Sequence, residues 1–236
     1  MSETKAVSLF GAKTDAMPAH LTQNIGDANL GNEAVSAEDL PTPVLDILQP
    51  LSPQVDADDG IPGAKAGMLC LTVTSELFNS VYAINLKYTK NFAVFRKRQR
   101  GGGFHGNFNT KGEAEAKLAE LPGSAADYDI VETANHIVLL LNEDGSVKQP
   151  ALIRLKSTGL AISRQWNADL TTRNEGHARF ATVWTLSTEK RQNDKGTWHV
   201  LDATYAGWAS EELYAEAKKM FTAFNTNPPQ GEAEAA

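Results

Sequence analysis

The chain has 236 residues, 42% of them hydrophobic, and a formal net charge of −7. That size predicts one folded domain, and no apolar run approaches the roughly 18 residues of a membrane-spanning helix. The single cysteine, Cys70, excludes an intramolecular disulfide and a multi-cysteine zinc site. Because the N-terminus also lacks the apolar segment and cleavage site of a signal peptide, we expect a reducing, cytoplasmic location and no membrane partner.

The charge is unevenly distributed along the chain. Residues 1–63 contain 10 acidic and 2 basic side chains, residues 64–204 contain 14 and 18, and residues 205–236 contain 5 and 2. The middle of the chain is therefore net +4 between two acidic ends. This asymmetry is typical of proteins that contact nucleic acid and carry acidic ends.

Composition divides the chain into three regions. Residues 1–38 are poor in large apolar side chains and show no sustained period, which predicts a disordered acidic arm. Residues 39–225 form the predicted domain, and the prolines at its start favour an extended lead-in over a helix. Residues 226–236 are predicted to be a short acidic tail.

The first half of the domain reads as strands followed by a helix. Residues 68–75, 81–89 and 91–99 are short, rich in β-branched and aromatic residues and partly alternating, which predicts three adjacent strands. A helix is predicted at residues 110–121, because Thr110 and Glu113 have the spacing of a capping box.

The second half reads as two hairpins separated by a helix. Residues 128–141 and 147–156 flank a tight turn at Asp144-Gly145, and Pro150 marks a bulge or an edge strand. A helix capped by Ser157 is expected next, followed by a hairpin of residues 179–190 and 196–208. A last helix, from Ser210, is expected to dock on the sheet through one apolar face: Leu213, Ala217, Met220, Phe221 and Phe224.

Residues 85–108 mix cations with aromatic side chains and end in a glycine-rich loop, Gly101 to Gly103. Single-stranded nucleic acid needs this mixture, since bases stack on aromatic faces while cations neutralise the backbone. The candidate binding residues are Lys87, Tyr88, Lys90, Phe92, Phe95, Arg96, Lys97, Arg98, Arg100 and Phe104. The alternative is that individual aromatics are core and that the cations are solvated at a strand end.

A second basic group surrounds the start of the predicted middle helix. It contributes Lys156, Arg164 and Trp166 to the candidate binding site, with Arg154 beside them. A helix N-terminus there would add amide donors for a phosphate. A core position for Trp166 is an equally good interpretation.

The sequence offers little support for catalysis. The five histidines form no HxH, HExxH or HxxxH pair. No GxxxxGK[ST] or GxSxG motif is present, and no GxGxxG lies between a predicted strand and a predicted helix. We therefore predict no catalytic residue, no metal ligand and no cofactor. A nuclease whose ligands meet only in the folded protein stays open as an alternative.

These motifs resemble those of a family of bacteriophage proteins that occur among replication genes and are generally regarded as single-stranded DNA-binding proteins. The resemblance covers residues 40–224. It rests on LDILQPLSP (45–53), RKRQRGGGFHGNF (96–108), LKSTGLAISRQWN (155–167), VWTLSTEKRQNDKGTW (183–198) and AGW (206–208). In layout the chain is also similar to the T7-like phage DNA-binding proteins, which have an OB barrel and an acidic tail. The tail here departs from that pattern, because Glu232 and Glu234 are its only acids and no terminal aromatic follows.

We therefore expect a mainly β (α+β) domain: an OB-like β-barrel with an inserted helix and a C-terminal helix. The expected function is binding of single-stranded DNA without strong sequence preference in phage replication or recombination. The resemblance implies an infected bacterial host and phage replication proteins as further partners, while a homo-oligomer stays open. The alternative is a phage structural or protein-interaction protein that uses the Arg-rich loop, and a metal-dependent nuclease is the third candidate.

Overall fold

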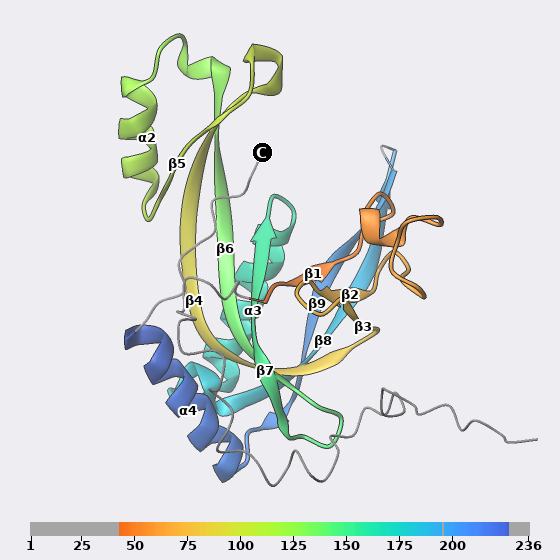
Figure 1. Ribbon diagram of the computed structural model, residues 1–236. Coiled ribbons are helices and arrows are strands. Elements are labelled where there is room, and N and C mark those ends of the chain that lie inside the picture. Colours follow the sequence, from red (N-terminus) through yellow and green to blue (C-terminus); the bar gives the residue numbers. More distant parts are fainter. Residues whose placement is uncertain (1–42, 195, 227–236) are drawn as a thin grey trace, which may run out of the picture. The chain divides into compact units, whose positions relative to one another are not determined.

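A computed structural model describes residues 43–194 and 196–226 (Figure 1). The predicted arm, residues 1–38, lies outside the described residues, as does all but the first residue of the predicted tail, 226–236.

The described residues form two antiparallel sheets and three α-helices. The larger sheet has the order β7-β6-β4-β8-β9, and β5 pairs with β4. Its strands are β4 (Val81–Arg96), β5 (Phe104–Phe108), β6 (Tyr128–Leu141), β7 (Val147–Lys156), β8 (Thr182–Asn193) and β9 (Gly196–Trp208). The smaller sheet consists of β1 (Leu45–Ile47), β2 (Leu69–Leu71) and β3 (Glu76–Phe78).

The mainly β, α+β class predicted from the sequence is confirmed, and the closed OB-like barrel is not. The strand path of the larger sheet ends at β7 on one side and at β9 on the other. No described pairing joins these two edges, so the sheet is open in this part of the chain.

The longest strand, β4, corrects the prediction of three adjacent short strands. Residues 81–89 and 91–99 belong largely to this one strand, whereas residues 68–75 supply β2 of the smaller sheet. The polar stretch around Asn91 resembles a turn in sequence, but it pairs with Thr133 of β6 and continues the strand. Figure 1 shows β4 running from the smaller sheet to the end of the larger sheet that carries α2 (Lys111–Glu120).

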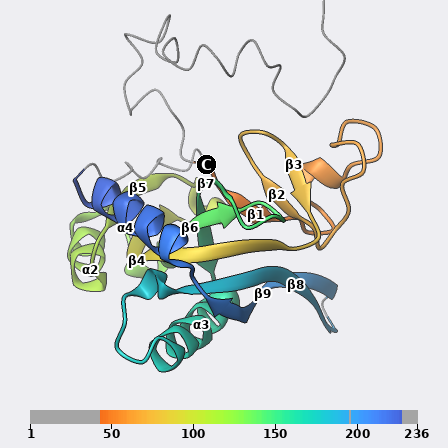
Figure 2. The same ribbon diagram turned by 90° about the horizontal axis from the view of Figure 1, so that it is seen from below.

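Two helices cover opposite faces of the larger sheet (Figure 2). Helix α3 (Gly159–Arg173) buries Trp166 and Leu170 against one face, here called the α3 face. Helix α4 (Glu211–Thr226) packs on the other, the α4 face, and buries Ala217 against Ile84 and Leu139. The docking face predicted for the last helix is therefore confirmed.

The predicted hairpins and helices after residue 110 are confirmed with small changes. The Thr110 hydroxyl accepts from the Glu113 amide and the Glu113 carboxylate accepts from the Thr110 amide, so the capping box is present. Pro150 lies in the edge strand β7, close to a register shift beside Leu140. Ser157 does not cap α3, because its φ is 49° and Thr158 occupies the N-cap position.

Candidate nucleic-acid interface

The binding residues predicted along β4 are divided between the two faces of the sheet. A bulge between Asn85 and Lys87 resets the alternation, so that Tyr88 pairs with His136 on the α3 face and Lys87 pairs with Ile137 on the α4 face. Lys87 donates to Asn225 of α4 at 2.7 Å. Side chains two apart share a face, so Tyr88, Lys90 and Phe92 lie on the α3 face.

The α3 face carries the Tyr88 ring and cations from three elements. Tyr88 is half-buried, and the Arg179 guanidinium lies over its ring at 5.5 Å from the centroid. Lys90 follows on the same face and pairs with Glu132 at 2.7 Å. The pKa of Lys90 lies above its usual value, mainly because of the hydrogen bond to Glu132. Burial and the nearby positive charge of Arg164 oppose this shift. We call Tyr88, Lys90, Arg164 and Arg179 the Tyr88 patch.

Arg179 belongs to a polar network between the sheet and α3. It lies in the short 3₁₀ turn η5 (Arg179–Ala181), just before β8. Its Nε donates to Asn85 Oδ1 at 2.6 Å, and its Nη2 donates to Asn167 Oδ1 at 2.5 Å. Burial lowers the pKa of Arg179 to about 10, opposed by Tyr88, so the side chain stays charged at neutral pH.

His136 is the buried centre of this network. Its Nδ1 lies 3.0 Å from Asn85 Nδ2 and 3.3 Å from Arg179 Nη2, which are both donors. The proton of a neutral imidazole therefore belongs on Nε2, which donates to Ser163 Oγ at 2.8 Å. Burial, and then the charge of Arg179, lower the pKa of His136 to about 3.

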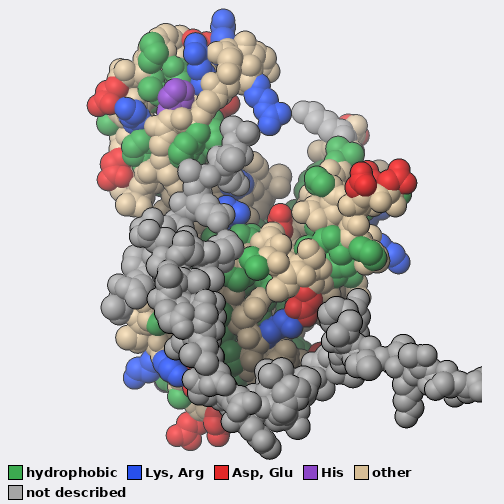
Figure 3. All heavy atoms as spheres, viewed as in Figure 1, with side chains coloured by type: hydrophobic (Ala, Val, Ile, Leu, Met, Phe, Trp, Pro, Cys, Tyr) green, Lys and Arg blue, Asp and Glu red, His purple; other side chains and the backbone are tan. Residues whose placement is uncertain are grey.

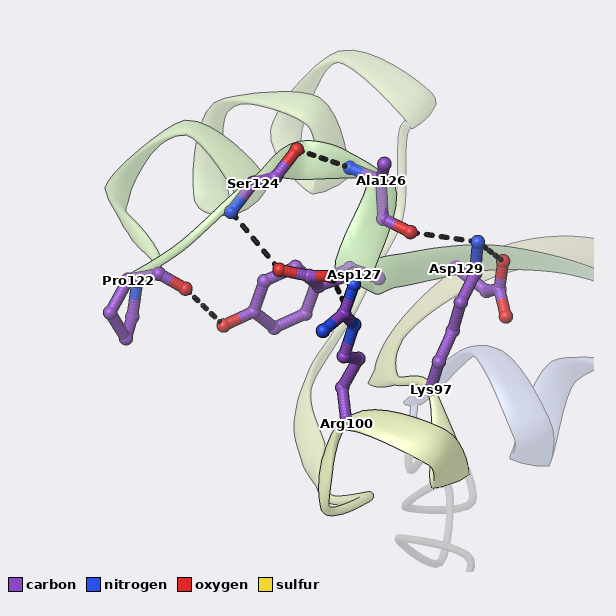
Figure 4. Close-up of polar contacts among 8 residues, drawn as sticks. Lys97, Arg100, Pro122, Ser124, Ala126, Asp127 and Asp129 are labelled. Carbon is purple, nitrogen blue, oxygen red and sulfur yellow. Dashed lines mark hydrogen bonds and ion pairs between the residues drawn. The ribbon is translucent and has the colours of Figure 1, made fainter.

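The basic loop, residues 96–104, lies at the far end of β4, where Lys and Arg side chains gather in Figure 3. Two of its cations are already paired: Arg100 Nε contacts Asp127 Oδ1 at 2.8 Å, and Lys97 Nζ lies 3.6 Å from Asp129 Oδ1 (Figure 4). Within the described residues, Arg98 has no recorded acidic partner and Arg96 has a buried Nε without a hydrogen-bond acceptor.

The glycine-rich loop is a hydrogen-bonded turn. Arg96 N donates to Gly103 O at 2.8 Å, and Gly102 N donates to Lys97 O at 3.1 Å. The three glycines have φ values of 103°, 67° and 127°, which disfavour other residue types. The turn leads directly into β5, a strand that the sequence prediction missed.

The aromatic residues that were predicted to stack on bases lie in different surroundings. Phe92 packs with Phe108 and Leu118 in a small core under α2. Phe95 and Phe104 are half-buried partners whose ring centroids are 5.4 Å apart. Trp166 is only 1% exposed and stacks on His136 at 4.7 Å, so its assignment as a base-stacking residue is wrong and the core interpretation is correct.

Lys156 lies apart from the Tyr88 patch. It lines a groove of about 730 Å³ between β1, the end of β7 and the β8–β9 hairpin, together with Arg154 and Trp198. Neither Arg164 nor any residue of the basic loop lines this groove. The predicted site residues are therefore distributed over the Tyr88 patch, the basic loop and the groove.

Sequence reasoning missed Asn85, His136 and Arg179. The first two interrupt apolar strand segments, and the structure buries both completely. A polar residue inside an apolar strand run was the available signal, because a buried polar group needs partners. The partners themselves are 94 residues apart for Arg179 and Asn85, beyond the reach of local patterns.

Within residues 43–194 and 196–226, no three His, Cys, Asp or Glu side chains are placed to hold a metal ion. No helix in this part of the chain is both long and apolar enough to cross a membrane.

The fold and the site define an α+β protein with an open antiparallel sheet, one face of which presents cations around a tyrosine. The family model of Pam3 phage gp34-like proteins matches residues 11–228, and the chain belongs to this family. The family indicates a bacteriophage origin, as the sequence resemblance implied. No curated protein and no solved structure matches the chain.

Proposed function

We propose that this phage protein binds single-stranded DNA without strong sequence preference during replication or recombination. The observation that carries the proposal is the Tyr88 patch, in which Arg179 of η5 lies over the Tyr88 ring and Arg164 of α3 lies near Lys90 on the same strand as Tyr88. This combination suits a single strand, because cations neutralise phosphates and the exposed part of the half-buried ring can contact a base.

An open sheet suits this function without a closed barrel. RNA-recognition domains also present aromatic side chains to unpaired bases from the face of an open sheet. In our proposal the Tyr88 patch binds one part of the strand, and the basic loop binds the backbone farther along β4. No part of this mechanism requires a catalytic residue.

The first test is fluorescence anisotropy with a labelled oligo-dT of about 15 nucleotides, a length near the upper end of typical single-strand sites. We expect binding at low salt that weakens steeply as salt rises, because bound cations release counterions from the DNA. The double variant Lys90→Ala/Arg164→Ala should bind at least about tenfold more weakly and lower the log–log salt slope by about 0.7 per lost contact.

The matched control is Lys111→Ala/Lys117→Ala on α2, outside the Tyr88 patch, where both lysines pair with glutamates as Lys90 does. This variant removes the same charge and should change affinity much less. Equal losses in both variants would reduce the proposal to a net-charge effect and overturn the assigned patch.

Failure of the wild-type protein to bind at low salt would favour the alternative, a structural or interaction protein that uses the basic loop. Cleavage of the oligonucleotide in the presence of Mg²⁺ or Mn²⁺ would instead favour a nuclease. In our proposal the protein acts in the cytoplasm of the infected cell beside phage replication proteins. Light scattering with and without DNA measures whether it acts as a homo-oligomer.

A further inference from the structure

Arg179 is a largely buried cation whose direct hydrogen-bond partners are all neutral. Among the described residues, its contacts are Asn85, Asn167, His136 and the Tyr88 ring. No carboxylate within that part of the chain forms an ion pair with it. A buried charge without a counterion is costly, so this arrangement calls for an explanation.

The hydrogen bonds use only part of the guanidinium. Nε and Nη2 bond to the two asparagine oxygens, and Nη2 also lies near His136. No described residue accepts from Nη1, and this nitrogen is not among the buried unsatisfied atoms. The two N–H groups of Nη1 are therefore open to solvent, while the rest of the fork is fixed in orientation.

The network keeps the guanidinium in place without neutralising it. Asn85 holds both Arg179 and His136 through its two amide atoms. His136 is tied in turn to Ser163, which is also buried. Every member of this network other than Arg179 is neutral. The positive charge of Arg179 is therefore not neutralised inside the protein, and Nη1 remains available to a ligand.

We propose that Arg179 is a phosphate-binding residue, held by Asn85 and Asn167 with Nη1 presented to the ligand. A phosphate oxygen is a suitable acceptor for these two N–H groups, and its negative charge offsets the buried cation. Tyr88, directly beneath the guanidinium, is then adjacent to the bound phosphate. That the phosphate is a diester of DNA rests on the function proposed above.

The first experiment uses inorganic pyrophosphate as the probe and the Nε–H resonance of Arg179 as the readout. We expect this NMR signal to be visible in the wild-type protein because Asn85 protects it from exchange, and its absence from the Arg179→Lys spectrum assigns it. Pyrophosphate should shift the signal saturably. The hydrogen-bonded backbone amide of Ala114 in α2 is the control and should move much less.

The second experiment measures oligo-dT affinity of Arg179→Gln, whose amide can still donate within the network. We expect an affinity at least about tenfold weaker and a salt slope lower by about 0.7, with unchanged circular dichroism. Arg179→Lys keeps the charge but loses the fork, and we expect an intermediate affinity.

The outcomes separate this inference from the proposed function. A pyrophosphate shift at Arg179 without DNA binding would keep the phosphate site and overturn the DNA function. Wild-type binding to DNA with an unmoved Arg179 resonance would keep the function and overturn the inference, whatever the variants do. Should Arg179→Gln fail to fold, the wild-type titration alone decides.

Discussion

The buried side chain of His136 should make the stability of the fold depend on pH. Its side chain is fully buried, and the pKa is lowered from 6.5 to about 3 by burial and by Arg179. The unfolded chain therefore binds a proton below about pH 6.5 that the folded protein does not bind until about pH 3, so stability falls as pH falls through this window. Between pH 7 and pH 5 the loss should be about 2 kcal/mol.

Urea unfolding at the two pH values measures this loss. His136→Gln should show a smaller difference, because the replacement cannot be protonated. His177→Gln, at an exposed position, is the control and should keep the wild-type difference. An equal pH dependence in wild type and His136→Gln would show that other groups cause it.

Trp166 illustrates how burial decides between two interpretations of one residue. Its ring lies between His136 and Trp184 in the core beneath α3. Trp166→Ala should lower the free energy of unfolding by about 3 kcal/mol or more, because it leaves a cavity. Trp208→Ala, at a 51% exposed position, should cost much less, and similar losses by urea unfolding would contradict the assigned packing.

Among the helices and strands, the correct predictions were those that depended on local sequence signals. The hairpin of β6 and β7 and helix α2 were predicted because a tight turn and a capping box specify them within a few residues. The smaller sheet was not predicted, because its pairings and its contact with β7 through Leu152 depend on the whole fold. The same limit explains the site: Tyr88, Lys90 and Arg164 were found by residue type, whereas Arg179 reaches them only through the fold.

Alanine substitutions in the basic loop test directly whether its positive charges bind DNA. Replacement of Arg96, Lys97, Arg98 and Arg100 by Ala should lower single-strand affinity at least about tenfold and reduce the salt slope by about 0.7 per lost contact. Because Lys97 and Arg100 already pair with Asp129 and Asp127, the Arg96/Arg98 double variant should account for most of the effect. Anisotropy and circular dichroism are the measurements.

The fold should tolerate the quadruple change, since the ion pairs of Lys97 and Arg100 lie at the surface and the buried Nε of Arg96 makes no hydrogen bond that would be lost. Unchanged affinity and slope in a folded quadruple variant would show that the loop does not contact DNA. That outcome would support a protein partner for the loop.

At the scale of the whole molecule, the acidic ends change how the basic middle attracts a polyanion. Residues 1–36 contain 4 acidic and 2 basic side chains, so their removal changes the net charge from −7 to −5. We expect equal or higher affinity for single strands and a nearly unchanged melting temperature, because the segment has little apolar surface to bury. A large fall in affinity would mean that the segment itself contacts the DNA.

The separation of the two basic regions along β4 predicts how affinity depends on oligonucleotide length. Lys90 and Arg98 are eight residues apart, which corresponds to about 26 Å of extended strand. At about 3.4 Å per stacked nucleotide, one strand needs roughly eight nucleotides to reach both. An oligo-dT of about four nucleotides should therefore contact one region at a time, and affinity should rise steeply until the strand spans both.

The variants make this prediction specific. With the short oligonucleotide, the Tyr88-patch and basic-loop substitutions should each weaken binding only modestly, because the strand can bind at the other region. With about 15 nucleotides, either substitution should remove the gain that comes from joining two sites on one strand. Length-independent affinity, or equal variant effects at both lengths, would mean that the two regions do not bind the same strand.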